Sequence, residues 1–516
     1  MDYLITGFSH VLNPITILWV TVGVTLGYVL GALPGLGKAT GVAVAIPMTF
    51  YLDPVTAIAM LIGIAKGSGA GSAVSAILLN TPGEPSSAPT ALDGYPLARQ
   101  GKAQKALKMG LFASVIGDFI STLVLIVLAA PLARYALLIG PIELCAILLF
   151  SLTFIGGLAG KSLIKGLIAA AFGVFFATVG LETETFIPRL TFDILELDSG
   201  ISLVPMAIGM LAIAEMIVQA GNMKKLDAET ANMYSKGRKK EDNIVTASDW
   251  RRSLPAIFRG TLIGSIVGIL PGLGASVGSF LSYGATKKAS KTPEKFGTGM
   301  IEGIAAAESA DNAVVPSSFI PLFALGIPGS VIAAILIAAF VLHGLTPGPQ
   351  MFQKQPQMVA DIYAAMLCAS VILLAVGYAG QRLFSQIIRV PIRLIIPGVM
   401  FLCCIGAYME TSSVFSIYVM LFFTVIGFIA RKLDFSFVTF LIGFVIGPNL
   451  ELTFRQAIQI LDQKAINLIH HPIAIIFIIL TMVTVVWIAR GSGSSKRAAK
   501  AAEVDKQTKT NKEGET

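Results

Sequence analysis

Charged residues are scarce in this chain. Only 13% of its 516 residues are Asp, Glu, Lys or Arg, whereas 55% are hydrophobic. Soluble domains carry about 25% charged residues, so the composition excludes a water-soluble enzyme or binding module of this length. Seven apolar segments come close to the roughly 20 residues that an α-helix needs to cross a bilayer: 109–130, 141–158, 163–180, 201–220, 361–380, 414–430 and 472–489. The sequence predicts an all-α polytopic membrane protein.

Cysteine and histidine are also rare. The four cysteines all lie in apolar runs, and two of the four histidines are the adjacent pair His470-His471. This pattern offers neither a disulfide framework nor the ligand spacing of a zinc site. The segment Gly274-Ala-Ser276-Val-Gly278 matches the nucleophile elbow of hydrolases, but no strand precedes it and no histidine is near. We predict that the protein is not an enzyme and has no cofactor.

The net charge of +8 could indicate a nucleic-acid partner. The basic residues, however, lie in short loops between apolar segments, which is typical of the positive-inside rule. We therefore predict no nucleic-acid partner. Residues 491–516 are rich in Ser, Lys and Ala and are predicted to form a disordered cytoplasmic tail, whereas the N-terminus lacks basic residues and is predicted to be periplasmic.

One glycine pattern occurs twice. The first copy has glycines at 23, 27, 31, 35, 37 and 41, and the second has them at 260, 264, 268, 272, 274 and 278. Every match has the same offset of 237 residues, and Leu-Pro-Gly-Leu-Gly lies in the middle of both copies. Duplicated apolar segments interrupted by Gly and Pro are typical of the binding sites of secondary transporters.

The loops of the two halves carry opposite charge. Loop 84–108 holds four basic residues, whereas its counterpart 344–360 holds only Lys354. Residues 287–295 hold four lysines, whereas their counterpart 48–57 holds no Lys or Arg. Two further pairs of loops show the same bias, which predicts two repeats of inverted topology. We expect a first membrane repeat at 1–221, a cytoplasmic linker at 222–254, a second membrane repeat at 255–490 and the tail at 491–516.

The glycine motifs are predicted to form re-entrant hairpins. Basic residues flank both sides of the second motif, and its arm 275–285 would span only about 16 Å at 1.5 Å per residue. A hairpin that enters from the cytoplasm therefore fits better than two crossings. Symmetry places the first hairpin on the outer side. We expect about 11–12 transmembrane helices plus two hairpins, and an elevator-like movement of a transport domain.

The hairpin tips are the predicted substrate site. Four-residue glycine spacing also serves helix packing, which explains the upstream glycines equally well. A Pro-Gly break within a membrane is different, because its free backbone must line protein or water, and a helix that begins there offers N–H groups to an anion. The predicted substrate-binding residues of the two tips are Gly35, Gly37, Lys38, Thr40, Gly272, Gly274, Ser276 and Ser279.

A second pair of elements, residues 66–72 and 308–312, is rich in small polar residues, and a Pro-Gly dipeptide follows each. We interpret both as helices broken near the middle of the membrane. They add Ser68, Ser72, Asn80 and Asn312 to the predicted substrate site. Glu308 and Asp311 are three residues apart, hence on one helical face, and are predicted to bind the coupling cation together with Asp118, because uncompensated carboxylates in lipid are costly. Structural pairing with neighbouring hydroxyl groups is the alternative, and for Asp118 we weigh it equally.

Several motifs together resemble one transporter family. They are Leu33-Pro-Gly-Leu-Gly37, Asn80-Thr-Pro-Gly-Glu84, Ala91-Leu-Asp-Gly-Tyr-Pro-Leu-Ala-Arg99, Glu308-Ser-Ala-Asp-Asn-Ala313, Leu325-Gly-Ile-Pro-Gly329 and His343-Gly-Leu-Thr-Pro-Gly-Pro349. The combination resembles the large membrane subunit of the tripartite tricarboxylate transporters over roughly residues 14–450. Asp311 departs from that pattern, because Asn is common at this position in such sequences.

The resemblance implies a permease in the bacterial inner membrane that imports citrate or other organic acid anions with Na⁺ or H⁺. It also implies two partners, a small membrane subunit and a periplasmic solute-binding protein. Apart from a Na⁺ near Glu308 and Asp311, no metal is expected. The alternatives are a stand-alone ion-coupled carboxylate transporter and an anion channel that works without a binding protein. Nothing in the sequence distinguishes one carboxylate substrate from another.

Overall fold

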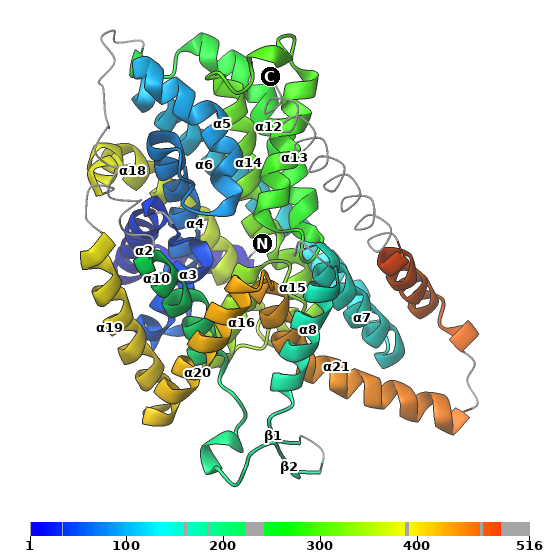
Figure 1. Cartoon of the computed structure of the whole chain (residues 1–516). Coiled ribbons are helices and arrows are strands. Elements are labelled where there is room, and N and C mark those ends of the chain that lie inside the picture. Colours follow the sequence, from blue (N-terminus) through cyan, green and yellow to red (C-terminus); the bar gives the residue numbers. More distant parts are fainter. Residues whose placement is uncertain are drawn as a thin grey trace, which may run out of the picture. The chain divides into compact units, whose positions relative to one another are not determined.

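A computed structural model describes residues 2–33, 35–158, 163–182, 185–221, 242–387, 392–464 and 468–486. These residues are almost entirely helical (Figure 1). They fall into two compact units. The first unit contains residues 1–138 and 179–432, and the second contains residues 139–178 and 433–516. Both units therefore combine segments that are far apart in the sequence, and neither corresponds to one sequence half.

Seven described helices are long and apolar enough to cross a membrane: Pro14–Ala32, Pro54–Leu79, Pro85–Ala136, Leu203–Gly221, Pro356–Gln381, Val414–Lys432 and Phe437–Asp462. Five shorter apolar helices accompany them: Pro141–Gly156, Ile164–Ala177, Val331–Leu342, Ile396–Thr411 and Pro472–Val486. The predicted all-α polytopic class is confirmed. The total of 11–12 crossings and the re-entrant placement of the tips stay predictions.

The first unit begins with α1 (Asp2–Val11), α2 (Pro14–Ala32), α3 (Lys38–Ala45), η1 (Ile46–Thr49), α4 (Pro54–Leu79), η2 (Pro85–Ser87), α5 (Ala88–Leu97), η3 (Ala98–Lys102) and α6 (Ala103–Ala136). After the second unit's first segment, the chain forms a short hairpin of β1 (Gly180–Leu181) and β2 (Pro188–Arg189), which pair antiparallel, and then η4 (Leu195–Leu197). The helices α9 (Leu203–Ala207), η5 (Ile208–Ile213) and α10 (Ala214–Gly221) follow without a break.

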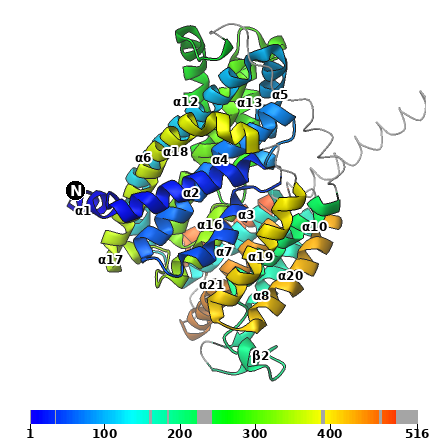
Figure 2. The ribbon, with the colours of Figure 1, turned by 90° about the vertical axis from the view of Figure 1, so that its left-hand side faces the viewer.

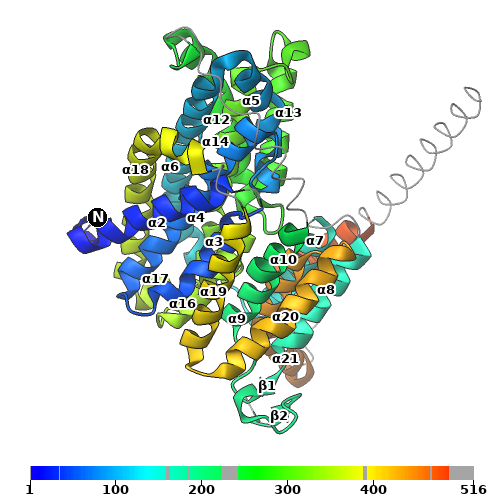
Figure 3. The same ribbon diagram turned by 60° about the vertical axis from the view of Figure 1, so that its left-hand side comes forward.

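The remainder of the first unit contains α12 (Ala247–Ile269), α13 (Gly274–Ala289), η8 (Pro293–Lys295), α14 (Ile301–Ser317), α15 (Phe319–Leu325), α16 (Val331–Leu342), α17 (Met351–Lys354), α18 (Pro356–Ile387), α19 (Ile392–Thr411) and α20 (Val414–Lys432). Figures 2 and 3 show α2 beside α4, and Figure 3 shows α12 beside α14. The second pair includes α14, which carries Glu308 and Asp311.

The second unit is a small helical cluster. Its helices are α7 (Pro141–Leu158), α8 (Leu163–Ala177), α21 (Phe437–Lys464), η9 (Leu468–His470) and the helix at 472–486. α21 packs against both α7 and α8. Oε1 of Glu143 in α7 lies 2.5 Å from Nδ1 of His471, so this histidine contacts a carboxyl group within the same unit.

The helix starts follow from local sequence signals. Asn13 and Asp53 accept backbone hydrogen bonds at the starts of α2 and α4, and a proline follows each of them. Thr246 and Asp249 form a capping box at the start of α12. Such side chains satisfy N–H groups that have no partner within the helix.

Glycines bring the paired helices into backbone contact. A Cβ atom at Gly27 would lie 2.2 Å from the Ile64 carbonyl oxygen, and one at Gly264 would lie 2.4 Å from that of Ala310. Gly31 and Gly268 face Ser68 and Val314 in the same way, at 2.1 and 2.7 Å. The matched glycines of α2 and α12 are 237 residues apart in the sequence. The residues that they face on α4 and α14 are 246 residues apart in both cases. The upstream glycines therefore serve helix packing, and both halves make equivalent contacts.

The predicted breaks at 66–72 and 308–312 are wrong. α4 is continuous from Pro54 to Leu79, and α14 is continuous from Ile301 to Ser317. The glycines of the first segment pack against α2 instead: a Cβ atom at Gly67 would lie 2.2 Å from the Val24 carbonyl oxygen. The glycine run thus permits close packing rather than unwinding.

Helices also extend into two segments that the sequence analysis treated as a loop and a linker. Loop 84–108 contains η2, α5, η3 and the beginning of α6, and the end of the predicted linker, residues 247–254, is the first part of α12. The capping box at Thr246 starts α12 in this polar stretch. Linker residues 222–241 and the tail 491–516 lie outside the described residues.

We expect alanine at the packing glycines to destabilise the first unit. Gly27→Ala and Gly264→Ala place a methyl group within 2.5 Å of a backbone oxygen, so α2 and α12 must move away from their partners, at a cost of about 1–3 kcal/mol. Thermal unfolding in detergent measures the loss. Gly284→Ala is the matched control, because nothing lies within 4 Å of its Cβ position. Equal stability of all three variants would contradict the packing role.

Candidate functional site

Each glycine motif forms a sharp non-helical link between two helices. α2 ends at Ala32 and α3 begins at Lys38, while α12 ends at Ile269 and α13 begins at Gly274. Gly35 and Gly272 have φ angles of 81° and 87°, a backbone region that favours glycine. The two links are equivalent in a further respect, since the Gly35 N–H donates to Gly83 O at 3.0 Å and the Gly272 N–H donates to Gly329 O at 3.3 Å.

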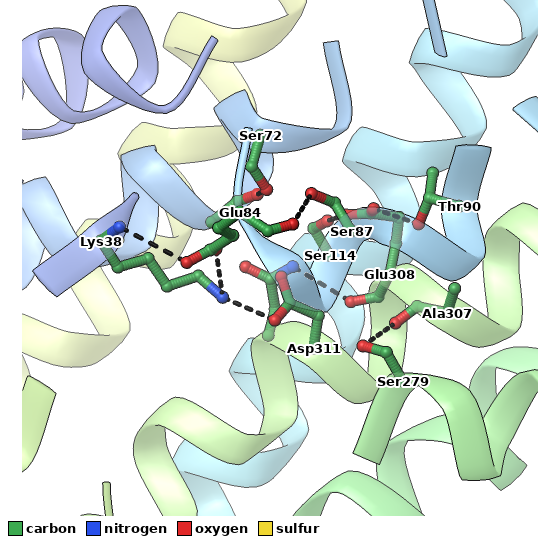
Figure 4. A network of polar contacts seen from close by, with 12 residues as sticks. Lys38, Ser72, Glu84, Ser87, Thr90, Ser114, Ser279, Ala307, Glu308 and Asp311 are labelled. Carbon is green, nitrogen blue, oxygen red and sulfur yellow. Dashed lines mark hydrogen bonds and ion pairs between the residues drawn. The ribbon is translucent and has the colours of Figure 1, made fainter. Parts of the chain in front are cut away.

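The helices that follow the two links pack across the halves. α3 packs against α16, which follows Pro328-Gly329, and α13 packs against η2, which follows Pro82-Gly83. Each link therefore lies next to the Pro-Gly segment of its own half, and its second helix contacts the corresponding region of the other half. This arrangement brings α3, η2, α13 and α14 around one buried polar centre (Figure 4).

Lys38 is at the middle of this centre. Its ammonium nitrogen lies 2.6 Å from Oδ1 of Asp311 and 2.9 Å from Oε1 of Glu84. The Lys38 side chain is 2% exposed, that of Asp311 0% and that of Glu84 15%. Figure 4 shows the ammonium group between the two carboxylates. The three residues come from α3, α14 and the segment between α4 and η2, so both halves of the sequence supply charge to one cluster.

The cluster carries surplus negative charge. One ammonium faces two carboxylates, and Oδ2 of Asp311 is buried without a hydrogen-bond partner in the described part of the chain. Buried polar atoms are nearly always paired, and an exception calls for an explanation. A bound cation would satisfy this oxygen, and hard cations such as Na⁺ are best matched by carboxylate and carbonyl oxygen ligands.

Glu308 lies one helical turn before Asp311 on α14 and is fully buried. Its Oε1 accepts a hydrogen bond from Thr90 at 2.6 Å, and its Oε2 accepts one from Ser114 at 3.0 Å. Both predicted coupling carboxylates on α14 thus lie in the same buried region, with different partners. Within the described residues no three His, Cys, Asp or Glu side chains form a metal-binding group.

Asp93 holds the chain that leads into α14. Its Oδ1 accepts hydrogen bonds from the N–H groups of Gly297, Gly299 and Met300 at 2.8–2.9 Å, and its Oδ2 accepts one from Tyr283 at 2.9 Å. The residue is buried. The carboxylate therefore connects α5 to the turn before α14 and to α13. It positions the helix that carries Glu308 and Asp311.

Asp118 belongs to a separate network. Its Oδ2 lies 2.5 Å from the Lys66 ammonium and also accepts a hydrogen bond from Ser370, while Lys66 donates to Ser370 at 3.1 Å. Thr122 lies 3.5 Å from the same ammonium. The pair joins α4, α6 and α18. Here one cation faces one anion, so the buried charge is balanced.

The other predicted residues are placed as follows. Ser279 donates to Ala307 O of α14 at 3.2 Å, whereas Ser72 and Asn312 donate to carbonyl groups of their own helices. Asn80 ends α4 in the left-handed conformation, with φ 56°. Gly37 is the N-cap of α3 and Gly274 begins α13. Thr40 and Ser68 are buried, the Ser68 hydroxyl group is without a partner among the described residues, and Ser276 is partly buried.

The site residues that the sequence analysis missed are Glu84, Lys66, Thr90, Ser114 and Asp93. Glu84 ends a recognised motif, and Lys66 lies in an apolar helix, where an idle charge is expensive. The sequence alone could therefore have indicated Glu84 and Lys66 as site candidates. Gly69 is a further addition, because a Cβ atom there would lie 2.6 Å from Lys38 Cε and from Asn312 Oδ1. Its missing side chain makes room for the lysine.

Comparison with known proteins places this chain. Residues 17–442 match the tripartite tricarboxylate transporter TctA family. The chain belongs to this family. The suspected resemblance is therefore confirmed, and the protein is a multi-pass membrane protein of a transporter family. A tripartite transporter has two further components, a small membrane subunit and a periplasmic binding protein, so the family implies both as partners.

Two relatives come from Agrobacterium vitis. The uncharacterized 52.8 kDa protein in the TAR-I ttuC' 3' region is 37% identical over 492 residues, which cover 95% of this chain and 96% of the relative. An uncharacterized protein in the TAR-II ttuC' 3' region is 36% identical over 234 residues, which cover 45% of this chain and 97% of the relative. No solved structure matches the chain.

We expect loss of Asp118 to destabilise the fold. Asp118→Asn leaves the Lys66 ammonium buried without its anion, and breaking a buried pair from one side costs about 3–5 kcal/mol. The double variant Lys66→Met with Asp118→Asn should recover most of the loss, because no unpaired charge remains. Thermal unfolding of the three proteins measures this. A double variant as unstable as Asp118→Asn would show that the ion pair is not the cause.

Proposed function

We propose that this TctA-family chain is the large permease subunit of a binding-protein-dependent secondary transporter that imports tricarboxylates or other organic acid anions with Na⁺ or H⁺. The observation that carries the proposal is the buried cluster of Lys38, Glu84 and Asp311, which unites both halves of the chain. Buried ionisable groups within membrane-spanning proteins mark ion and substrate pathways.

The two halves are proposed to be inverted repeats. The matched glycine contacts and the matched hydrogen bonds of Gly35 with Gly83 and of Gly272 with Gly329 support a structural repeat. The opposite charge of the corresponding loops supports the inversion. Inverted repeats whose chain breaks meet at one site suit alternating access. Movement of a transport domain in an elevator-like manner is part of this proposal.

The substrate is proposed to bind at the chain breaks. The Lys38 ammonium and the N-terminus of α3 supply positive charge there. Ser and Asn side chains of the predicted set, together with the N-terminus of α13, would hold the remaining oxygens of a carboxylate. Glu308 and Asp311 are proposed to hold Na⁺ or H⁺ close by, so that cation and anion partly neutralise each other during crossing.

The family match supports a proposal for the cellular location of the protein. We propose that the chain lies in the bacterial inner membrane with a cytoplasmic C-terminus and a periplasmic N-terminus. A periplasmic receptor would deliver the anion, and a small membrane subunit would accompany the permease. A stand-alone ion-coupled transporter and an anion channel are the alternatives that experiment must separate.

Uptake by the reconstituted complex should require an ion gradient. We expect labelled citrate, or another carboxylate bound by the receptor, to accumulate in proteoliposomes only when inward Na⁺ or proton gradients are imposed. The measurement compares accumulation with and without each gradient, in the presence and absence of the receptor. Flux that ignores both gradients would indicate a channel, and full uptake without the receptor would indicate a stand-alone transporter.

Replacement of Glu308 should weaken ion coupling. Glu308→Gln keeps the shape but removes the ionisable carboxyl group that accepts hydrogen bonds from Thr90 and Ser114. A lost charged interaction of about 1.5–3 kcal/mol corresponds to a roughly 10- to 100-fold higher cation concentration for half-maximal uptake. Glu302→Gln on the same helix is the control, because Glu302 pairs with Arg252 away from the cluster. Unaltered cation dependence would remove Glu308 from the coupling role.

A further inference from the structure

In the proposed transporter, the substrate and two protein carboxylates compete for the ammonium group of Lys38. Its ammonium group is already bound by Asp311 and Glu84, at 2.6 and 2.9 Å. An incoming carboxylate that uses this charge must compete with those two side chains. Because an ammonium group has three donors and one charge, it cannot balance two protein carboxylates and a substrate carboxylate together. Binding of the substrate therefore has to change what Lys38 does for the protein.

Glu84 occupies the position at which an anion would be bound. Its Oε1 faces the Lys38 ammonium, while its Oε2 lies 3.5 Å from the Lys38 backbone N–H at the start of α3. A side chain at Gly37 would also come within 3.1 Å of Glu84. Ammonium group and helix N-terminus meet here, which is a favourable place for a carboxylate. With 15% of its side chain exposed, Glu84 is the most accessible member of the cluster.

We propose that Lys38 is a tethered cation that alternates between the carboxylate pair Glu84/Asp311 and the substrate. Without substrate, its ammonium group fills the pair. A substrate carboxylate displaces Glu84 from the ammonium group and from the N-terminus of α3, and draws Lys38 away from Asp311. Only then are both carboxylates of the pair free to bind the coupling cation. No covalent bond changes in this exchange. This inference rests on the proposed carboxylate transport and gives it a physical basis for coupling.

The charge balance explains why the exchange would couple the two ligands. With Lys38 in place, the pair has one uncompensated negative charge, and Oδ2 of Asp311 has no partner among the described residues. Once the substrate takes Lys38, two uncompensated carboxylates remain buried side by side. Uncompensated charge is costly at this depth. Substrate binding thus raises the affinity of the pair for Na⁺ or H⁺, and the bound cation in turn favours the substrate-bound arrangement.

The exchange predicts that removal of Lys38 imitates the effect of the substrate. A protein with Lys38→Met should bind the coupling cation in the absence of any carboxylate. The ionisable groups that act on the emptied site are Glu84, Asp311 and, one turn away, Glu308. Lys38→Arg keeps the tethered positive charge, so its unfolding midpoint should respond to the cation as weakly as that of the unmodified chain.

Thermal unfolding of the purified full chain, without added carboxylate, tests this. In one series NaCl replaces choline chloride at constant ionic strength and pH, and in the other the pH varies at constant salt. A ligand that binds only the folded state raises the unfolding midpoint as its concentration rises. We expect the midpoint of Lys38→Met to rise by several degrees with Na⁺ or with acidification, and those of the unmodified chain and Lys38→Arg to change much less. The series that responds identifies the cation.

The triple variant Lys38→Met, Glu84→Gln, Asp311→Asn is the matched control without the carboxylate pair. It retains Glu308, as the unmodified chain does, and its midpoint should respond no more than that of the unmodified chain. Should Lys38→Met not fold at any NaCl concentration or pH, Lys38→Met with Glu84→Gln carries the test, because only one carboxylate of the pair is then uncompensated. Equal responses of the unmodified chain and the Lys38→Met proteins, or a response of the triple variant as large as that of Lys38→Met, would overturn the proposal. Absence of gradient-driven uptake by the unmodified complex would instead refute the proposed function, and it leaves these measurements unaffected.

Discussion

A positive charge buried between two negative ones holds the centre of this protein together. The Lys38 ammonium group is excluded from water, and such a group is tolerated only when anions compensate it. Asp311 from the second half of the chain and Glu84 from the first supply that compensation. The folded state therefore requires α3, the segment after α4, and α14 to meet. Asp93 serves the same end, since it positions the turn before α14 through three backbone N–H groups.

Close helix packing makes this meeting of charges feasible. The glycines of α2 and α12 bring their backbones against α4 and α14, so the chain links that follow lie next to the Pro-Gly segments of the same halves. Gly69 leaves space on α4 through which the aliphatic part of Lys38 passes. Small residues thus have two distinct uses here. The glycines of α2 and α12 allow the helices to approach closely, whereas Gly69 makes room for a long charged side chain.

Sequence patterns predicted the class of the protein, its family and the duplicated glycine links, and they singled out Lys38, Glu308 and Asp311 as candidate site residues. These features depend on composition or on spacing within one segment. The helix break predicted at residues 66–72 was wrong, because a run of glycines is equally compatible with unwinding and with close packing. Only the residues of α2 that face this run decide between the two. The partners of Lys38 were not predicted, since the lysine and Asp311 are 273 residues apart in the sequence. No local pattern reports a pairing of that kind.

The two buried networks, around Lys66 and around Lys38, differ in their balance of charge. Lys66 and Asp118 neutralise each other, and Ser370 and Thr122 add hydrogen bonds, so the fold itself accounts for every charge in that network. The cluster around Lys38 is different, because one ammonium group faces two carboxylates and a third, that of Glu308, lies one turn away. Folding alone does not explain surplus charge in a region where each uncompensated group is costly. A balanced pair can be replaced by apolar residues at little cost in stability, whereas an unbalanced cluster is stabilised by a ligand of opposite charge. For this reason the surplus at Lys38, rather than the mere presence of buried charge, indicates where a cation and an anion meet.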